Sequence, residues 1–382
     1  MREGECIAVP KLAPVEVPGL LAAQLFTLLD AGTAFSDVHV REGAALRVRC
    51  AGRLCSQPLA PIDRDALHAF LAAVCPEVHW PTRLEQGGGH WDFGFGLAGA
   101  RFRGNLHRCH GGQVLGLVLR RLDDAPAPLD VLGLPASVLQ FVDRRAGLVL
   151  VTGPTGSGKS TTLAALVEHI NHTRDGQIVT IEDPIELIHQ PRRCVITQRE
   201  VGIDVSSFAE GLRAAFRQDP DVILIGEIRD RDTMATALAA AEAGHLVLAT
   251  LHTLSAAKTV DRITDFFGGD DRALVRGVLA SVLVGVIGQV LLPRQDGTGR
   301  VLAWELMEAT PPVTSLIREG RSHQIPNAIS TGAMPNLQLL NRTLIQLVRA
   351  RLVTLQDARR ASYDPREFER ECELRDGAFG HG

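Results

Sequence analysis

The chain has 382 residues, of which 45% are hydrophobic and 22% charged, with a formal net charge of −4. This is an ordinary soluble composition, long enough for two domains, and the charge argues against nucleic acid as a main partner. The seven cysteines are scattered without a C-x-x-C pair, which argues against a disulfide framework or a zinc site and favours reduced thiols in the cytosol.

The N-terminus, Met1-Arg-Glu-Gly-Glu-Cys6, lacks a basic region followed by an apolar core, so no targeting segment is expected. Residues 1–122 then mix helical patterns at 20–29 and 64–74 with strand patterns at 37–40, 46–49, 91–95 and 100–103. Glycine-rich turns such as Gln86-Gly-Gly-Gly89 separate the strands. This mixture predicts a small N-terminal α+β domain.

A polar, proline-bearing run, Asp123-Asp-Ala-Pro-Ala-Pro-Leu-Asp130, predicts a linker over residues 123–135. After it, apolar strand patterns at 148–152, 178–181, 222–225 and 246–250 alternate with helical ones. Such alternation predicts an α/β domain over residues 136–382, with a mainly parallel sheet covered by helices on both faces. From about residue 315 the pattern is mostly helical and polar.

The run Gly153-Pro-Thr-Gly-Ser-Gly-Lys-Ser160 fits the phosphate-loop template G-x-x-x-x-G-K-[ST], between a strand pattern at 147–152 and a helix pattern at 161–169. Backbone N–H groups at such a helix N-terminus hold phosphate. We expect Lys159 to neutralise the β- and γ-phosphates and the Ser160 hydroxyl to ligate Mg²⁺. The predicted nucleotide-binding residues are Gly153, Pro154, Thr155, Gly156, Ser157, Gly158, Lys159, Ser160 and Thr161. The protein is predicted to bind ATP or GTP.

Acidic residues follow two further strand patterns, in Asp221-Val-Ile-Leu-Ile-Gly-Glu227 and Ile181-Glu-Asp-Pro-Ile-Glu186. Carboxylates at strand ends beside a phosphate loop can complete the Mg²⁺ shell and orient an attacking water. A third strand ends in Thr250-Leu-His252 and is preceded by His245. A histidine there can sense the γ-phosphate or couple subunits, although a lone histidine is more often structural.

One apolar stretch, residues 277–292, contains Gln289 and three glycines and is short for a membrane span. We expect it to form a buried helix of the α/β domain.

Together the motifs resemble those of the secretion ATPase superfamily. Five segments carry the resemblance: the phosphate loop, residues 181–186, residues 212–221, Gly226-Glu-Ile-Arg-Asp230 and residues 244–253. In that family they make up the motifs called Walker A, Asp box, Walker B and His box. Nearly the whole chain resembles the retraction-motor (PilT) branch. Residues 34–39 and 100–105 are similar to that branch's PAS-like N-terminal domain, and Leu316-Ile-Arg-Glu-Gly320 to its C-terminal retraction signature.

This resemblance implies a RecA-like core that hydrolyses ATP with Mg²⁺ in a homo-hexameric ring. Glu227 and Glu182 would support Mg²⁺, and Glu186 would orient the water, although Glu186 and Glu227 could trade roles. His245 and His252 would couple phosphate state to the sheet. Arginines would complete the site across a subunit boundary, unless they are only solvated surface charges. The candidates are Arg101, Arg103, Arg120, Arg213 and Arg217.

The implied function is type IV pilus retraction by a cytoplasmic ring, peripheral at the inner membrane, that acts on a platform protein. Residues 292–300 hold no cysteine where assembly and type II secretion motors carry a zinc module, so retraction is favoured over assembly. Pro335, Asn336, Asn341 and the run 285–289 depart from the branch's pattern. They leave open an accessory paralogue of the PilU kind, acting beside another motor with little turnover of its own. A ring translocase acting on DNA stays open as a less favoured alternative, without a basic and aromatic groove to support it. A phosphotransferase is conceivable, although no second-substrate pocket is identifiable.

Overall fold

The computed structural model describes residues 19–31, 35–50, 53–76, 78–122, 126–269, 271–331 and 337–376. The N-terminal run 1–6, Ala34, linker residues 123–125, Pro335 and Asn336 lie outside the described residues. The chain divides into two compact units. The first comprises Met1–Ala125 with Pro184–Ile188, and the second comprises Pro126–Asp183 with His189–Gly382.

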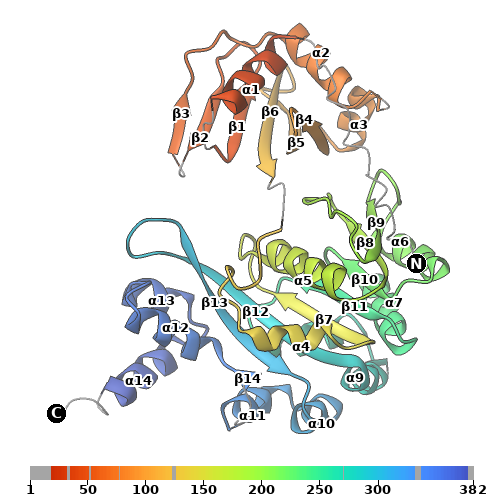
Figure 1. The fold of residues 1–382 in the computed structure, drawn as a ribbon, viewed down its shortest axis with the longest axis vertical. Helices are drawn as coiled ribbons and strands as arrows, with labels where there is room; N and C mark the ends of the chain where they lie inside the picture. The colour runs from red at the N-terminus through yellow and green to blue at the C-terminus, as the bar shows by residue number, and fades with distance from the viewer. Residues whose placement is uncertain are drawn as a thin grey trace, which may run out of the picture. The chain divides into compact units, whose positions relative to one another are not determined.

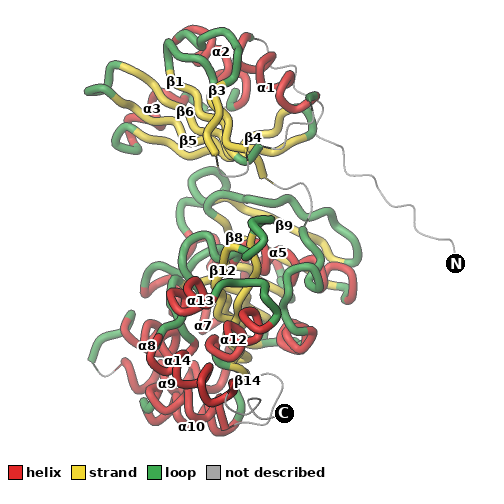
Figure 2. The backbone as a smooth tube through the Cα atoms, turned by 90° about the vertical axis from the view of Figure 1, so that its left-hand side faces the viewer, coloured by secondary structure: helices red, strands yellow, loops and turns green. Residues whose placement is uncertain are grey.

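The first unit is built on a six-stranded antiparallel sheet with strand order β3-β2-β1-β6-β5-β4 (Figure 1). Its elements are α1 (Leu20–Asp30), β1 (Asp37–Arg41), β2 (Arg47–Cys50), β3 (Arg53–Ser56), α2 (Arg64–Val74), α3 (Trp80–Gln86), β4 (His90–Leu97), β5 (Ala100–Cys109) and β6 (Val114–Leu122). Alternate strand residues such as Val38 and Phe102 share one core with Leu25 of α1 and Phe70 of α2. The strands of this sheet and the helices α1 and α2 can be followed along the backbone in Figure 2. This is the predicted α+β architecture, with α3, β3 and β6 unforeseen.

The second unit contains an eight-stranded sheet with strand order β14-β13-β12-β7-β11-β10-β8-β9. Its strands are β7 (Gly147–Thr152), β8 (Gly176–Glu182), β9 (Cys194–Glu200), β10 (Val222–Ile225), β11 (Leu246–Leu251), β12 (Leu283–Pro293), β13 (Arg300–Glu308) and β14 (Leu337–Gln338). The pairs from β12 through β7, β11, β10 and β8 to β9 are parallel, whereas β13 pairs antiparallel with β12 and β14. The predicted parallel sheet is therefore confirmed, with an antiparallel extension on one side.

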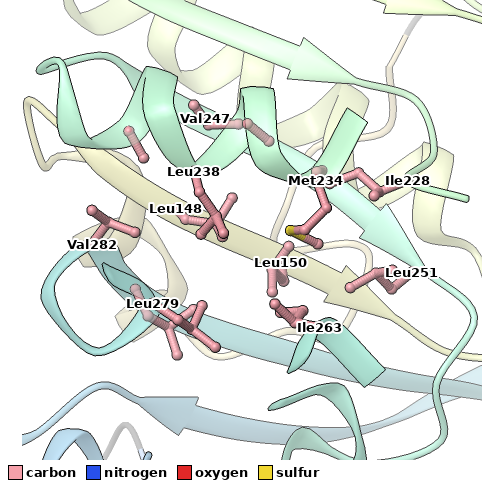
Figure 3. Packing of buried hydrophobic residues seen from close by; sticks show 14 of the residues in the cluster. Leu148, Leu150, Ile228, Met234, Leu238, Val247, Leu251, Ile263, Leu279 and Val282 are labelled. Atoms are coloured by element: carbon pink, nitrogen blue, oxygen red, sulfur yellow. The ribbon is translucent and has the colours of Figure 1, made fainter. Parts of the chain in front are cut away.

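Helices cover both faces of this sheet. They are α4 (Leu139–Val142), α5 (Lys159–Thr173), α6 (Phe208–Ala215), α7 (Arg231–Glu242), α8 (Ala256–Asp265), α9 (Asp271–Val282), α10 (Pro311–Glu319), α11 (Ile325–Thr331), α12 (Leu340–Arg349), α13 (Leu355–Ala361) and α14 (Pro365–Asp376). Leu148 and Leu150 of β7 lie among α7, α8 and α9 (Figure 3). The intervening Val149 and Val151 pack with α4 and α5 on the opposite face. The central strand is thus buried from both sides, which fixes where the loop after it emerges.

The prediction of one buried helix over residues 277–292 is wrong. Helix α9 ends at Val282, and β12 continues the run beside β7. A uniformly apolar run has no period that separates helix from strand. Gly285 shows why the strand packs so closely, because a Cβ there would lie 2.4 Å from Phe141 Cε2. No helix among the described residues is long and apolar enough to cross a membrane.

The last three helices share a small separate core. Leu340 and Leu344 of α12 pack with Phe368 of α14 and with Ala303 of β13. The retraction-like signature lies elsewhere, at the end of α10, where Gly320 has a φ of 71° and closes the helix in the left-handed conformation.

Candidate functional site

Four loops of the second unit emerge at one edge of its sheet. The register pairs Leu251 with Thr152 and places Ile225 beside both Ala249 and Ile181. The carboxyl ends of β7, β8, β10 and β11 are therefore level, and the residues that follow them meet there. These residues are the phosphate loop, Asp183, Glu227 and His252, with Glu182 as the last residue of β8.

The phosphate loop depends on its glycines. Gly153, Gly156 and Gly158 have φ values of 145°, 78° and 89°, in the region that favours glycine. At Gly153 a Cβ would also lie 2.3 Å from the Gln289 carbonyl oxygen, so a side chain cannot fit. Helix α5 begins at Lys159 directly after the loop, and its first N–H groups face an incoming anion.

Lys159 is held at the centre of the site. Lys159 is 9% exposed, and its Nζ donates hydrogen bonds to the carbonyl oxygens of Gly153 at 2.9 Å and Pro154 at 3.1 Å. Nζ also lies 3.4 Å from Nδ1 of His252. The lysine charge is thus positioned inside the loop, where phosphate oxygens would meet it.

Glu227 links the histidine to an arginine. Its Oε1 lies 2.9 Å from His252 Nε2, and its Oε2 lies 2.7 Å from Arg229 Nη2. Burial alone would raise the pKa of Glu227, but the charges of Arg229, His252 and Lys159 outweigh it and hold the pKa below its ordinary value. The hydrogen bond to Glu227 raises the pKa of Arg229 in turn. Arg229 was not among the site residues predicted from the sequence, although a basic residue two positions after the acid at the strand end could have indicated it.

Glu182 is oriented by neutral donors. Thr180 Oγ1 donates to its Oε1 at 2.7 Å and Gln198 Nε2 donates to the same oxygen at 3.1 Å. These bonds fix the carboxylate at the end of β8. The adjacent Asp183 lies 4.0 Å from Arg229, measured from Oδ2 to Nη1, which ties the β8 loop to the Glu227 network.

Glu186 belongs to the first unit, because the segment Pro184–Ile188 groups there. Its Oε1 lies 3.9 Å from Arg103 Nη1, and Arg101 Nη2 donates to the Ile185 carbonyl oxygen at 3.3 Å. The structure thus brings Glu186 together with two of the arginines predicted to act across a subunit boundary.

His245 lies at the opposite end of β11 from His252. Leu246 pairs with Gly147 at the start of β7, and the strand from Leu246 to Leu251 spans about 17 Å at roughly 3.3 Å per residue. The His245 ring is 2.7 Å from the Pro220 carbonyl oxygen, through Nδ1, and stacks on Phe216 at 5.8 Å. The structure therefore does not bring His245 to the Lys159 cluster.

The remaining arginine candidates have different surroundings. Arg120 Nε lies 2.9 Å from Asp37 Oδ1 in the first unit. Burial would raise the pKa of Asp37, but its bonds to Arg120 and Ser36 hold the pKa below its ordinary value. Arg213 on α6 and Arg217 in the turn Phe216–Gln218 are both exposed.

The donor set fits a nucleoside triphosphate. Thr152 Oγ1 and Ser157 Oγ are buried beside the loop and have no hydrogen-bond partner among the described residues. Ser160 and Thr161 are exposed in the first turn of α5. In the described part of the chain, no group of three His, Cys, Asp or Glu residues could hold a metal unaided. Mg²⁺ beside a bound nucleotide is usually held by phosphate oxygens and water with one or two protein ligands, and Ser160 is the hydroxyl that the phosphate loop offers.

Residues 104–361 match the family model described as "Type II/IV secretion system protein". The chain is 41% identical to the type IV pilus retraction ATPase PilT of Pseudomonas aeruginosa, over 87% of this chain and 96% of that protein. It is 36% identical to the type IV pilus ATPase PilU of the same organism, over 85% and 84% of the two chains.

The fold agrees with these sequence matches. A crystal structure of the pilus retraction motor PilT with bound ADP superposes with a TM-score of 0.83 at 42% identity, and the match covers 92% of this chain and 99% of that one. Motif order, phosphate-loop geometry and full-length similarity therefore agree. The chain belongs to the type II/IV secretion system protein family, and within it to the branch of type IV pilus retraction ATPases.

Proposed function

We propose that this protein is a hexameric ATP-driven motor that retracts type IV pili by acting on an inner-membrane platform protein. The supporting observation is the chain of contacts from Lys159 through His252 and Glu227 to Arg229 at the edge where the phosphate loop emerges. Similarity to a retraction ATPase over 87% of the chain gives this site its biological setting.

Within the proposed site, Lys159 and the N–H groups of the loop bind the β- and γ-phosphates. Ser160 contributes a hydroxyl ligand to Mg²⁺, whose charge would neutralise the phosphate oxygens. Glu227 stays anionic at neutral pH because its pKa is lowered, which suits support of the metal through water. Glu182, held by Thr180 and Gln198, is the second acid of the metal's surroundings.

Glu186 is our candidate for the residue that orients the attacking water. Its carboxylate lies close to Arg103 within the first unit, and we infer that it meets a reacting phosphate in the assembled ring, where domains move during turnover. Arg101, Arg103, Arg213 and Arg217 are the proposed source of charge from a neighbouring subunit. This arrangement makes turnover depend on assembly, as a hexameric motor requires.

The test is Mg²⁺-dependent phosphate release by the purified protein at concentrations where it forms rings. The matched variants are Lys159→Ala and Glu186→Gln, with Arg217→Gln and dilution below the assembly concentration as tests of the contribution from a neighbour. Turnover that falls to background in the first two variants supports the self-sufficient motor. Turnover that survives in Lys159→Ala contradicts the site.

A second candidate is an accessory ATPase that assists another retraction motor. The 36% identity to the P. aeruginosa protein PilU favours keeping this candidate, because that protein is a separate pilus ATPase with 84% of its length matched. An accessory protein would bind ATP with its acids intact and yet release phosphate no faster than Lys159→Ala. Restoration of turnover by a co-purified motor would then identify it.

A further inference from the structure

Glu305 is a buried carboxylate at the junction of three structural layers. It lies on β13 and is 3% exposed. Its Oε1 accepts a hydrogen bond of 2.6 Å from the backbone N–H of Ala256, and its Oε2 accepts one of 3.4 Å from that of Leu340. These are the first residues of α8 and α12. One side chain therefore joins the first residues of two helices.

The α8 contact leads to the nucleotide site. Only residues 253–255 separate His252 from α8, and His252 contacts both Glu227 and Lys159. Two side-chain bonds tie this turn to α8: Thr253 Oγ1 bonds to Thr259 Oγ1 at 2.7 Å, and the Ser255 side chain caps α8 at Lys258 N. The turn therefore connects His252 to Ala256 through a short, hydrogen-bonded segment.

The strand contact leads to the same site from another side. Glu305 lies opposite Gly288 of β12, and Gly288 pairs with Thr152, the residue before the phosphate loop. A Cβ on Gly288 would lie 3.3 Å from the Glu305 Cβ and 3.8 Å from Thr152 Oγ1. Only Gly288 of β12 therefore lies between Glu305 and Thr152, at the end of the strand that carries the phosphate loop.

The α12 contact leads to the C-terminal helices. Leu340 starts α12, whose Leu344 packs against Phe368 of α14. The Tyr363 hydroxyl, between α13 and α14, is buried and has no hydrogen-bond partner among the described residues. Burial and then the Glu305 charge raise the pKa of that tyrosine.

The chemistry favours a carboxylate over a neutral side chain. Two backbone N–H groups require two acceptors, and a glutamine of the same shape supplies one acceptor and one donor. An apolar residue at position 305 would leave both buried N–H groups without their acceptor, and a buried carboxyl is tolerated only when its oxygens are hydrogen-bonded in this way.

We propose that Glu305 is a positioning residue that couples the His252 turn of the nucleotide site to helices α12–α14. Through it, a change at the phosphate loop alters how firmly the C-terminal helices are held to the sheet. This inference rests on the proposed nucleotide site around Lys159, and the experiment separates the two.

The experiment is hydrogen exchange of the full-length protein at pH 8, where Glu305 is ionised, with ADP and with a non-hydrolysable ATP analogue. In the wild type, the amides of the first turns of α8 and α12 should change together between the two nucleotides. In Glu305→Gln the α12 response should disappear and its basal exchange rise about tenfold, because one hydrogen bond to a charged acceptor is lost. The affinity for ADP should stay within about twofold, because the hydrogen bonds of Glu305 go to Ala256 and Leu340 and not to the phosphate-binding groups of the loop.

Thr343→Val is the matched control. Thr343 Oγ1 donates to the Trp304 carbonyl oxygen at 2.7 Å, so its loss loosens the same helix from the same strand without touching α8. The control should lower stability but keep the nucleotide response. An α12 response that survives in Glu305→Gln, or is lost equally in Thr343→Val, overturns the proposal.

The wild type alone also tests the idea if Glu305→Gln does not fold. A nucleotide response in α8 without one in α12 overturns the coupling. Absence of any response at residues 153–161 contradicts the nucleotide site instead, so the two failures are distinguishable.

Discussion

The free energy of unfolding of this protein should depend on pH, and the titration of Glu305 should contribute strongly to that dependence between pH 4.5 and about 7. Burial raises the pKa of Glu305 from its ordinary value of 4.5 to about 7, and the two backbone hydrogen bonds only partly oppose this. The native state therefore holds a proton on this carboxyl between pH 4.5 and about 7, where the unfolded chain has released it. Because the native state binds more protons in this window, rising pH must lower the free energy of unfolding.

The size of the effect follows from the two pKa values. A difference of 2.5, taken from about 7 and 4.5, corresponds to about 3 kcal/mol at roughly 1.4 kcal/mol per pH unit. The Glu305 contribution is fully favourable below pH 4.5, falls through the window, and stays constant above pH 7. Other ionisable groups titrate in the same range, so the wild type alone does not isolate this one.

The assay compares wild type with Glu305→Gln by urea unfolding at several pH values from 4.5 to 8. Every other titrating group is common to both proteins, so the difference between their free energies of unfolding reports on residue 305. Trp304, the neighbouring residue, is a convenient fluorescent probe, with far-UV circular dichroism as a second one. From pH 4.5 to about 7, the free energy of unfolding of the wild type should fall by about 3 kcal/mol relative to that of the variant.

A flat difference would refute the reasoning, because it would mean that the carboxyl has the same pKa in both states. A difference that rises with pH would refute it more strongly. It would show that the Ala256 and Leu340 N–H groups outweigh burial and depress the pKa.

Three further changes follow from the described contacts. Arg229→Ala removes the main group that lowers the pKa of Glu227, so burial should raise that pKa. The acid limb of the pH profile of ATP turnover should then move to higher pH, and an unmoved limb would exclude Glu227 as the group responsible. Gly153→Ala should abolish nucleotide binding, measured by titration calorimetry, because its Cβ meets the Gln289 carbonyl oxygen at 2.3 Å and φ is 145°; unchanged affinity would contradict this loop geometry. Gly285→Ala should destabilise the fold by about 1–3 kcal/mol through overpacking against Phe141, seen as a lower Tm, and an unchanged Tm would show that the ring can move aside.

Much of the architecture was predictable because its signals are local. The helix expected at residues 64–74 is α2, Arg64–Val74, which begins at the N-cap Asp63. The strand expected at 222–225 is β10, Val222–Ile225, whose four residues are all buried. Short apolar runs between polar turns are sufficient evidence for such elements.

The failures arose where pattern alone lacks information. The run after Val282 is rich in β-branched residues, but its continuous apolarity hides the change from α9 to β12. His245 and His252 flank one strand, and both were assigned to the site, although only the carboxyl end of β11 faces the phosphate loop. Arg229 and Glu305 were missed because their significance lies in partners distant in the sequence, or on another strand, which no single segment reveals.

The discontinuity of the first unit has a practical consequence. Residues 184–188 complete a unit whose other residues precede residue 126. During synthesis the N-terminal sheet therefore emerges from the ribosome some sixty residues before its last piece, and residues 126–183 are made in between. For the same reason, one cut near residue 126 does not separate two independent halves. A truncated chain beginning there would carry Ile185 and Glu186 without Arg101 and Arg103, the residues that contact them.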